Sequence, residues 1–118
     1  MGSFVAEGSF WKLFPQAAIG VVVATGMKPT SEIARDDVDE IATLLKRANV
    51  DARRHLTSDT ISENGPVKAW REAYRRFKTK KGARCSVENL LKRVLKDNPV
   101  GHITPAVDIY NTVSLTYA

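Results

Sequence analysis

The last third of the chain, residues 86–117, contains the feature that most constrains its fold. An apolar segment there runs Val107-Asp108-Ile109-Tyr110-Asn111, which places a carboxylate, a phenol and a carboxamide among residues typical of a protein core. Burying a polar group without a hydrogen bond costs roughly 1–3 kcal/mol. We therefore expect this segment to contain a hydrogen-bonded network, a binding site, or both.

The composition is that of one soluble globular domain. The chain has 118 residues, of which 43% are hydrophobic and 26% charged, and this length can bury a core without disulfides. The single cysteine, Cys85, excludes an intrachain disulfide and a cysteine-rich zinc site. The first ten residues lack a signal-peptide pattern, and the longest apolar run, 17–24, is too short to span a bilayer. We expect a cytoplasmic protein without membrane association.

Positive charge is concentrated in the second half of the sequence. Residues 1–65 contain seven basic and nine acidic side chains, whereas residues 66–118 contain eleven basic and four acidic ones. The halves therefore carry about −2 and +7, which together give the net charge of +5. A clustered positive field favours a polyanionic partner, most commonly RNA or DNA. A well-solvated surface is the alternative.

Hydrophobic periodicity predicts three helices and one clear strand. The helices are expected over Glu32–Asn49, with a further short turn through Arg54, over Pro66–Phe77, and over Ser86 to about Lys96, where Ser86 would cap the helix. The β-branched run Ala18–Thr25 predicts a buried strand. Residues 103–117 are expected to be mostly extended, although their spacing leaves open a short helix around 107–113.

Few residues carry the signature of an enzyme or a cofactor site. His55 and His102 have no metal-ligand spacing, Cys85 has no cysteine-enzyme motif around it, and no glycine-rich phosphate loop is present. We therefore expect no metal and no cofactor, and the sequence singles out no catalytic residue. Trp70 and Tyr74 lie on one helical face with Phe77, which favours a core position over stacking on unpaired bases.

The pair Asp108 and Asn111 has two interpretations. A carboxylate and a carboxamide at this spacing could hold a buried turn of the backbone together, or they could line a pocket. The chemistry of the two groups favours the structural role. Arg71, Arg75 and Arg76 flank the aromatic face and are better candidates for phosphate contacts, with a solvated surface as the alternative.

Several motifs in order resemble the paired third and fourth B domains of the phenylalanyl-tRNA synthetase β subunit and their free-standing relatives. The similar stretches are Phe14-Pro15 followed by Ile19–Val23, Trp70-Arg71-Glu72-Ala73-Tyr74, Ser86-Val87-Glu88, Leu90-Leu91-Lys92-Arg93, Val107-Asp108-Ile109-Tyr110-Asn111 and Val113-Ser114-Leu115. They cover most of the chain, and the free-standing form is the better match. The resemblance implies an α/β (α+β) fold with a mixed sheet and packed helices.

The resemblance also implies a function. In the synthetase this module binds the acceptor end of a tRNA and hydrolyses the ester of a tRNA charged with tyrosine instead of phenylalanine. A positioned water and oriented polar groups are sufficient for such hydrolysis. By this resemblance the pocket would consist of Ile103, Thr104, Pro105, Asp108 and Asn111, and the tRNA phosphates would meet Arg71, Arg75, Lys80, Lys81, Arg84 and Arg93. A non-catalytic module that binds RNA or a synthetase is the alternative.

The chain departs from the family pattern in two ways. Thr104 stands where the family usually has asparagine, and Thr104 lacks the paired donor and acceptor of a carboxamide. Family members also continue well past the Val-Ser-Leu stretch, so residues 1–118 would be a single, partial editing-module-like domain from the N-terminal portion. We expect residues 113–117 to form an uncovered sheet edge, which a second copy or another chain would complete.

Overall fold

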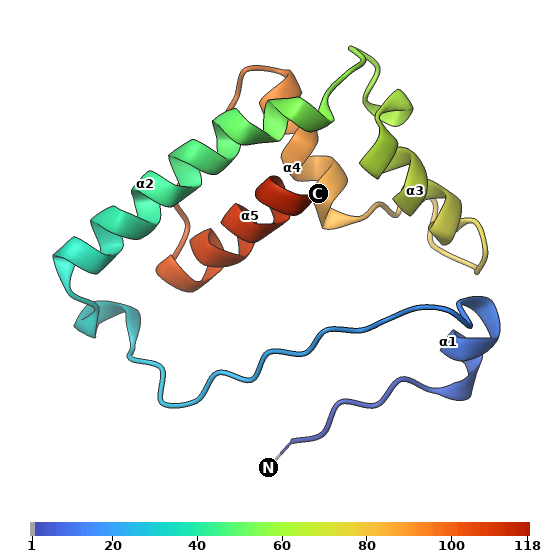
Figure 1. Cartoon of the computed structure of the whole chain (residues 1–118), viewed down its shortest axis with the longest axis horizontal. Helices are drawn as coiled ribbons and strands as arrows, with labels where there is room; N and C mark the ends of the chain where they lie inside the picture. Colours follow the sequence, from blue (N-terminus) through green and yellow to red (C-terminus); the bar gives the residue numbers. More distant parts are fainter. Residues whose placement is uncertain (1) are drawn as a thin grey trace.

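The computed structural model describes residues 2–118, and throughout these residues the regular structure is helical, with no strand (Figure 1). The α-helices are α1 (Gly8–Leu13), α2 (Arg35–Asp51), α3 (Gly65–Tyr74), α4 (Ser86–Leu95) and α5 (Pro105–Tyr117); the 3₁₀ turns are η1 (Thr30–Glu32), η2 (Ala52–His55) and η3 (Ile61–Glu63). The predicted α/β fold with a mixed sheet is therefore wrong for the part of the chain that the structure describes.

The three predicted helices are confirmed as α2, α3 and α4, with shifted ends. The turn predicted after the first of them is η2. Helix α3 ends at Tyr74 rather than Phe77, and α4 begins at Ser86, so the N-cap residue is Cys85 and not the predicted Ser86. In neither α3 nor α4 does the side chain of the N-cap residue accept a hydrogen bond from the first turn of the helix.

The segment predicted to be mostly extended, 103–117, forms helix α5 instead. Thr104 is its N-cap and accepts a hydrogen bond from the Val107 N–H at 3.3 Å, while Pro105 occupies the first turn with its φ already fixed. Asp108 adds a negative charge to the first turn, where the helix dipole favours it. The short helix that the sequence left open around 107–113 is thus part of a longer one, and residues 113–117 form no sheet edge.

The second sheet element is also missing. Residues 18–25 are extended, but no backbone hydrogen bond joins residues 18–28 to other residues within 2–118. Val22 and Val23 are 95% and 81% exposed, so the predicted buried strand is wrong. An extended segment becomes a strand only when a neighbour pairs with its backbone, and the segment expected to supply the sheet is helix α5. The expected completion of a sheet edge at residues 113–117 by a second copy or another chain therefore loses the strand on which it was based.

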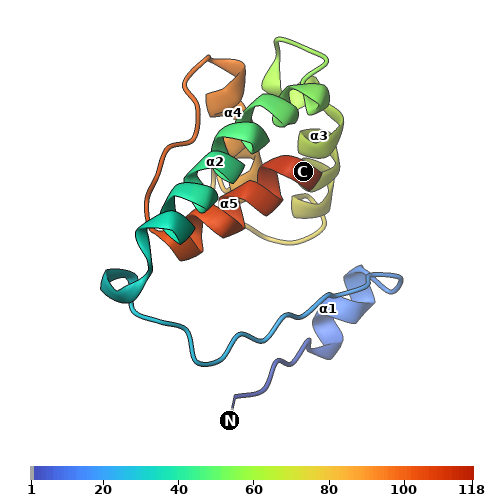
Figure 2. The same cartoon turned by 60° about the vertical axis from the view of Figure 1, so that its left-hand side comes forward.

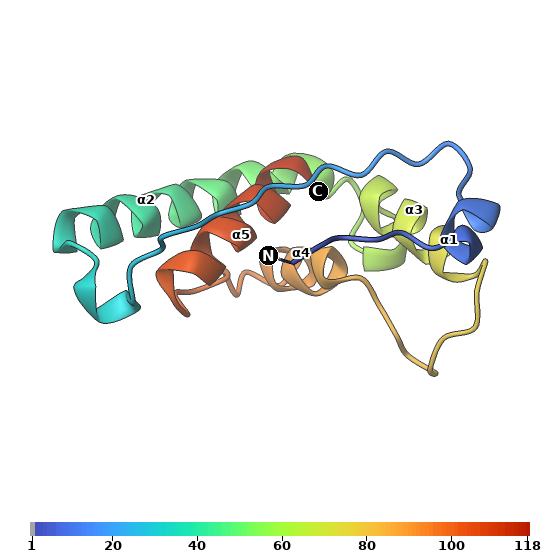
Figure 3. The same cartoon turned by 90° about the horizontal axis from the view of Figure 1, so that it is seen from below.

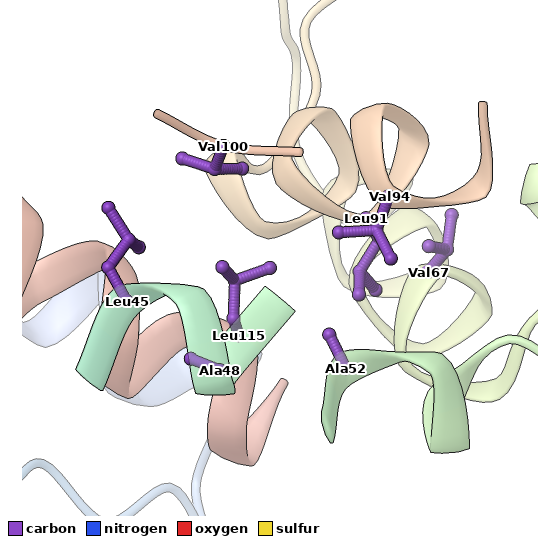
Figure 4. Close-up of a cluster of buried hydrophobic side chains, with 8 residues drawn as sticks. All are labelled: Leu45, Ala48, Ala52, Val67, Leu91, Val94, Val100 and Leu115. Carbon is purple, nitrogen blue, oxygen red and sulfur yellow. The ribbon is translucent and has the colours of Figure 1, made fainter. Parts of the chain in front are cut away.

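The core lies where α2, α3, α4 and α5 meet. Helices α2 and α5 lie side by side, with α4 and α3 beyond them (Figures 1 and 2). The buried apolar side chains are Leu45, Ala48, Ala52, Val67, Leu91, Val94, Val100 and Leu115, and Figure 4 shows them pointing into the common interior. Helix α1 and the extended segment after it lie outside this core (Figures 1 and 2), and the view from below shows α1 near α3 (Figure 3).

A buried asparagine links α2 to the loop that follows α4. The carboxamide of Asn49 donates to the carbonyls of Leu45 and Val100, each at 3.0 Å, and accepts from the Val100 N–H at 2.8 Å. Val100 is itself buried, so Asn49 satisfies both of its backbone polar groups away from water. This link fixes the start of the loop that leads to α5.

Candidate nucleic-acid interface and adjoining pocket

The connection between α3 and α4 is strongly basic. Residues 75–85 contain six basic side chains and no acidic one; these are Arg75, Arg76, Lys78, Lys80, Lys81 and Arg84. All six are exposed. Gly82 adopts a φ of 80°, a left-handed conformation that favours glycine and turns the loop back toward α4.

Helix α3 and this loop enclose a cavity of about 250 Å³ that combines cations with aromatic rings. Its lining includes Trp70, Tyr74, Phe77, Arg71, Arg75 and Arg84. Trp70 and Phe77 are 45% and 41% exposed, and of the apolar stripe predicted for this helix only Val67 lies in the core. The core interpretation of these two aromatic residues is therefore wrong. We define the lining named here as the basic aromatic pocket.

Helix α1 faces the aromatic side chains of α3 and the following loop across a second cavity. This cavity, of about 470 Å³, lies between α1 and α3, and it also borders Trp70, Tyr74 and Phe77. The rings of Phe14 and Phe77 meet edge to face with their centroids 6.4 Å apart. The guanidinium carbon of Arg76 lies 5.4 Å from the centroid of the Phe14 ring, and the same guanidinium donates to the Leu13 carbonyl at 3.2 Å. The aromatic side chains thus face open space on two sides rather than a sealed core.

One predicted phosphate ligand, Arg71, is held in an ion pair. Its guanidinium donates to both carboxylate oxygens of Glu88, at 2.6 and 3.0 Å, and Glu88 is buried. This fork-shaped hydrogen bonding lowers the pKa of Glu88, and in return it raises the pKa of Arg71. Arg84 lies 3.7 Å from the same carboxylate. Arg71 therefore joins α3 to α4, while Arg75, Lys80 and Lys81 make no ion pair among residues 2–118.

The Glu88 ion pair predicts an acid-sensitive contribution to stability. Because the folded-state pKa of Glu88 lies below its ordinary value of 4.5, the stabilisation is complete above that value and is lost as the pH falls through the lower folded pKa. We expect Glu88→Gln to lower the free energy of unfolding by roughly 1–3 kcal/mol at pH 7 and to flatten its decline below pH 4.5. Urea unfolding of both chains across pH 3–7 measures this; an unchanged acid slope in the variant would contradict it.

The residues of the predicted pocket separate into two groups around the start of α5. Asp108 is 1% exposed, and its Oδ1 accepts from the Ile103 N–H at 2.9 Å, which is the structural role favoured from sequence. Thr104 caps the helix and Pro105 is buried. Ile103 and Asn111 instead border a cavity of about 290 Å³, which we call the α5 pocket; its lining is Leu90, Arg93, Val100, Gly101, His102, Ile103 and Asn111.

Arg93 and His102 both border the α5 pocket, which the sequence did not predict for either residue. Arg93, expected to meet phosphate, lies here at the other end of α4 from the basic aromatic pocket. His102, which has no metal-ligand spacing in the sequence, is an exposed loop residue, and its Nδ1 lies 2.5 Å from Oδ2 of Asp108. His102 lies just before α5 and Asp108 lies in its first turn. Their contact could have been expected only if the sequence had predicted that a helix begins after Thr104.

Other kinds of site find no support within residues 2–118. No group of three or more histidine, cysteine, aspartate or glutamate side chains is placed to hold a metal ion in this part of the chain. None of its helices has the length and apolar content that a bilayer-spanning segment needs. No protein-family model, curated protein or solved structure gives a significant match to the chain.

Proposed function

We propose that the chain is an RNA-binding module that holds the single-stranded acceptor end of a tRNA. The observation that carries this proposal is the basic aromatic pocket, where three arginines and three partly open aromatic rings share one cavity. Proteins that bind single-stranded RNA combine these two kinds of side chain, because cations neutralise the backbone and every base has a face that stacks on an aromatic ring.

The two kinds of side chain have separate roles in this proposal. Arg75, Lys80 and Lys81 lie exposed and without an ion pair within residues 2–118, so they are free to meet phosphates. Trp70 and Phe77 offer exposed ring surface for one or two unpaired bases. Arg71 contributes mainly by joining α3 to α4, since Glu88 occupies its guanidinium.

The α5 pocket supports a second element of the proposal, hydrolysis of a mischarged aminoacyl ester at the bound tRNA end. Asn111 is 7% exposed, yet its carboxamide makes no hydrogen bond to another of residues 2–118 and borders the cavity. The carboxamide of Asn111 is therefore available to donate to, and accept from, a ligand in this cavity. The sequence motifs similar to the synthetase editing module point to the same substrate. The alternative is a module that binds RNA or a synthetase without catalysis.

Substituting one tryptophan tests the stacking. We expect Trp70→Ala to weaken the binding of deacylated tRNA about 10-fold, since stacking on one base is worth roughly 1–3 kcal/mol. Trp11→Ala is the matched control: Trp11 is 40% exposed, close to the 45% of Trp70, and borders neither cavity of α3. Fluorescence anisotropy of labelled tRNA measures both affinities. Equal effects of the two substitutions would remove the basic aromatic pocket as the RNA-binding site.

A further inference from the structure

We infer that His102, oriented by Asp108, is the general base of an ester hydrolase whose reaction takes place in the α5 pocket. This inference rests on the proposed function, which supplies the substrate class, an aminoacyl ester at an RNA end. It goes beyond it by assigning a catalytic residue.

The hydrogen bonds of Asp108 determine which nitrogen of His102 carries the hydrogen. This carboxylate is 1% exposed, its Oδ1 is occupied by the Ile103 N–H at 2.9 Å, and its Oδ2 lies 2.5 Å from Nδ1 of His102. A buried carboxylate accepts hydrogen bonds only, so the hydrogen on the neutral imidazole belongs on Nδ1. The lone pair of His102 then lies on Nε2, the nitrogen that can take a proton from water.

The imidazole of His102 is open to solvent on one side and faces the α5 pocket on the other. The His102 side chain is 56% exposed, so water and substrate can reach it. Its Nε2 has no hydrogen-bond partner among residues 2–118, and the side chain borders the α5 pocket together with Asn111 and Arg93. The pocket therefore combines a base with two N–H donors, the carboxamide of Asn111 and the guanidinium of Arg93. One guanidinium nitrogen of Arg93 also makes long contacts to Asn98 Oδ1 at 3.4 Å and the Pro99 carbonyl at 3.3 Å. A base and oriented donors of this kind support ester hydrolysis by an activated water.

The reaction that these groups support is direct attack by water. Nε2 of His102 takes a proton from water while the water oxygen bonds to the ester carbonyl carbon. The N–H groups of Asn111 and Arg93 stabilise the negative charge that forms on the carbonyl oxygen. The bond from that carbon to the ribose oxygen then breaks, and the imidazolium returns its proton to the ribose oxygen. The products are a free amino acid and an RNA with a free hydroxyl.

Deacylation of tRNA charged with tyrosine in place of phenylalanine, and of a panel of tRNAs charged with other wrong amino acids, tests the assignment. Loss of a general base costs 10²–10⁴-fold in rate, so we expect His102→Ala to lower the deacylation rate by at least about 100-fold. Free imidazole should restore part of the rate, because the exposed side chain leaves an open space. His55→Gln is the control: His55 borders none of these cavities and its substitution should keep the rate.

The possible outcomes separate the inference from the proposed function. If the unaltered chain deacylates a substrate and His102→Ala does so equally fast, the inference is wrong and the proposed hydrolysis stands. If the unaltered chain is inactive on the whole panel, both hydrolysis and the inference fail, and tRNA binding is judged on its own measurement. Nitrogen-detected NMR adds a test without substrate: neutral His102 should carry its hydrogen on Nδ1, and a predominance of the Nε2–H form would overturn the assignment.

Discussion

Asn49→Ala should be among the most destabilising single substitutions in the chain. It removes three hydrogen bonds and leaves both the N–H and the carbonyl of buried Val100 without a partner. Each buried polar group left unpaired costs roughly 1–3 kcal/mol, so we expect a loss of roughly 2–4 kcal/mol in the free energy of unfolding. Thermal and urea unfolding, followed by circular dichroism, measure the loss.

Asn98→Ala is the matched control for Asn49. Asn98 is exposed, and its side chain makes a single long contact of 3.4 Å with Arg93. Its loss should change stability by less than about 0.5 kcal/mol, as is usual for surface positions. If both substitutions cost the same, the link between α2 and the loop after α4 does not hold the fold together.

Neutralising the free cations of the α3–α4 loop should produce the largest effect on binding. We expect Arg75→Gln, Lys80→Gln and Lys81→Gln together to weaken tRNA binding by about 10- to 100-fold near physiological salt. The slope of log affinity against log salt should also become shallower by about 2, because each phosphate contact to a single strand contributes roughly 0.7. Affinities measured at several salt concentrations provide both numbers.

A variant with the same charge change elsewhere separates local contacts from net charge. Lys28, Lys46 and Arg47 are exposed and lie in the first half of the sequence, and replacing all three with glutamine also lowers the net charge from +5 to +2. We expect this control to keep most of the affinity and most of the salt slope. Equal losses in the two triple variants would show that the loop has no special role.

The sequence predicted helices α2, α3 and α4 because their apolar residues recur at helical spacing. It failed at residues 18–25, where β-branched residues favour an extended backbone but cannot by themselves provide the neighbour that a strand requires. It failed again at α5, whose buried face is formed by Pro105, Asp108, Asn111 and Leu115. Two of these four are polar, so the usual apolar stripe does not mark the inward side.

The sequence predicted which residues of the candidate site are chemically unusual, but not which of them contact one another. The polar groups of Asp108 and Asn111 were conspicuous within an apolar segment, and the basic bias of residues 66–118 identified the α3–α4 loop. The partner of Asp108 was not predictable, because His102 reaches it only across the turn before α5. The engagement of Arg71 by Glu88 also depends on how α3 packs against α4, which local sequence does not determine.

The central claim is that the chain recognises the single-stranded end of a tRNA rather than any polyanion. The most direct measurement compares its affinity for an intact tRNA with its affinity for the same tRNA lacking the unpaired 3′ nucleotides, at one salt concentration. We predict at least about a 10-fold loss on truncation, since stacking on the aromatic residues of the basic aromatic pocket is then absent. Equal affinity for the two RNAs would contradict the account.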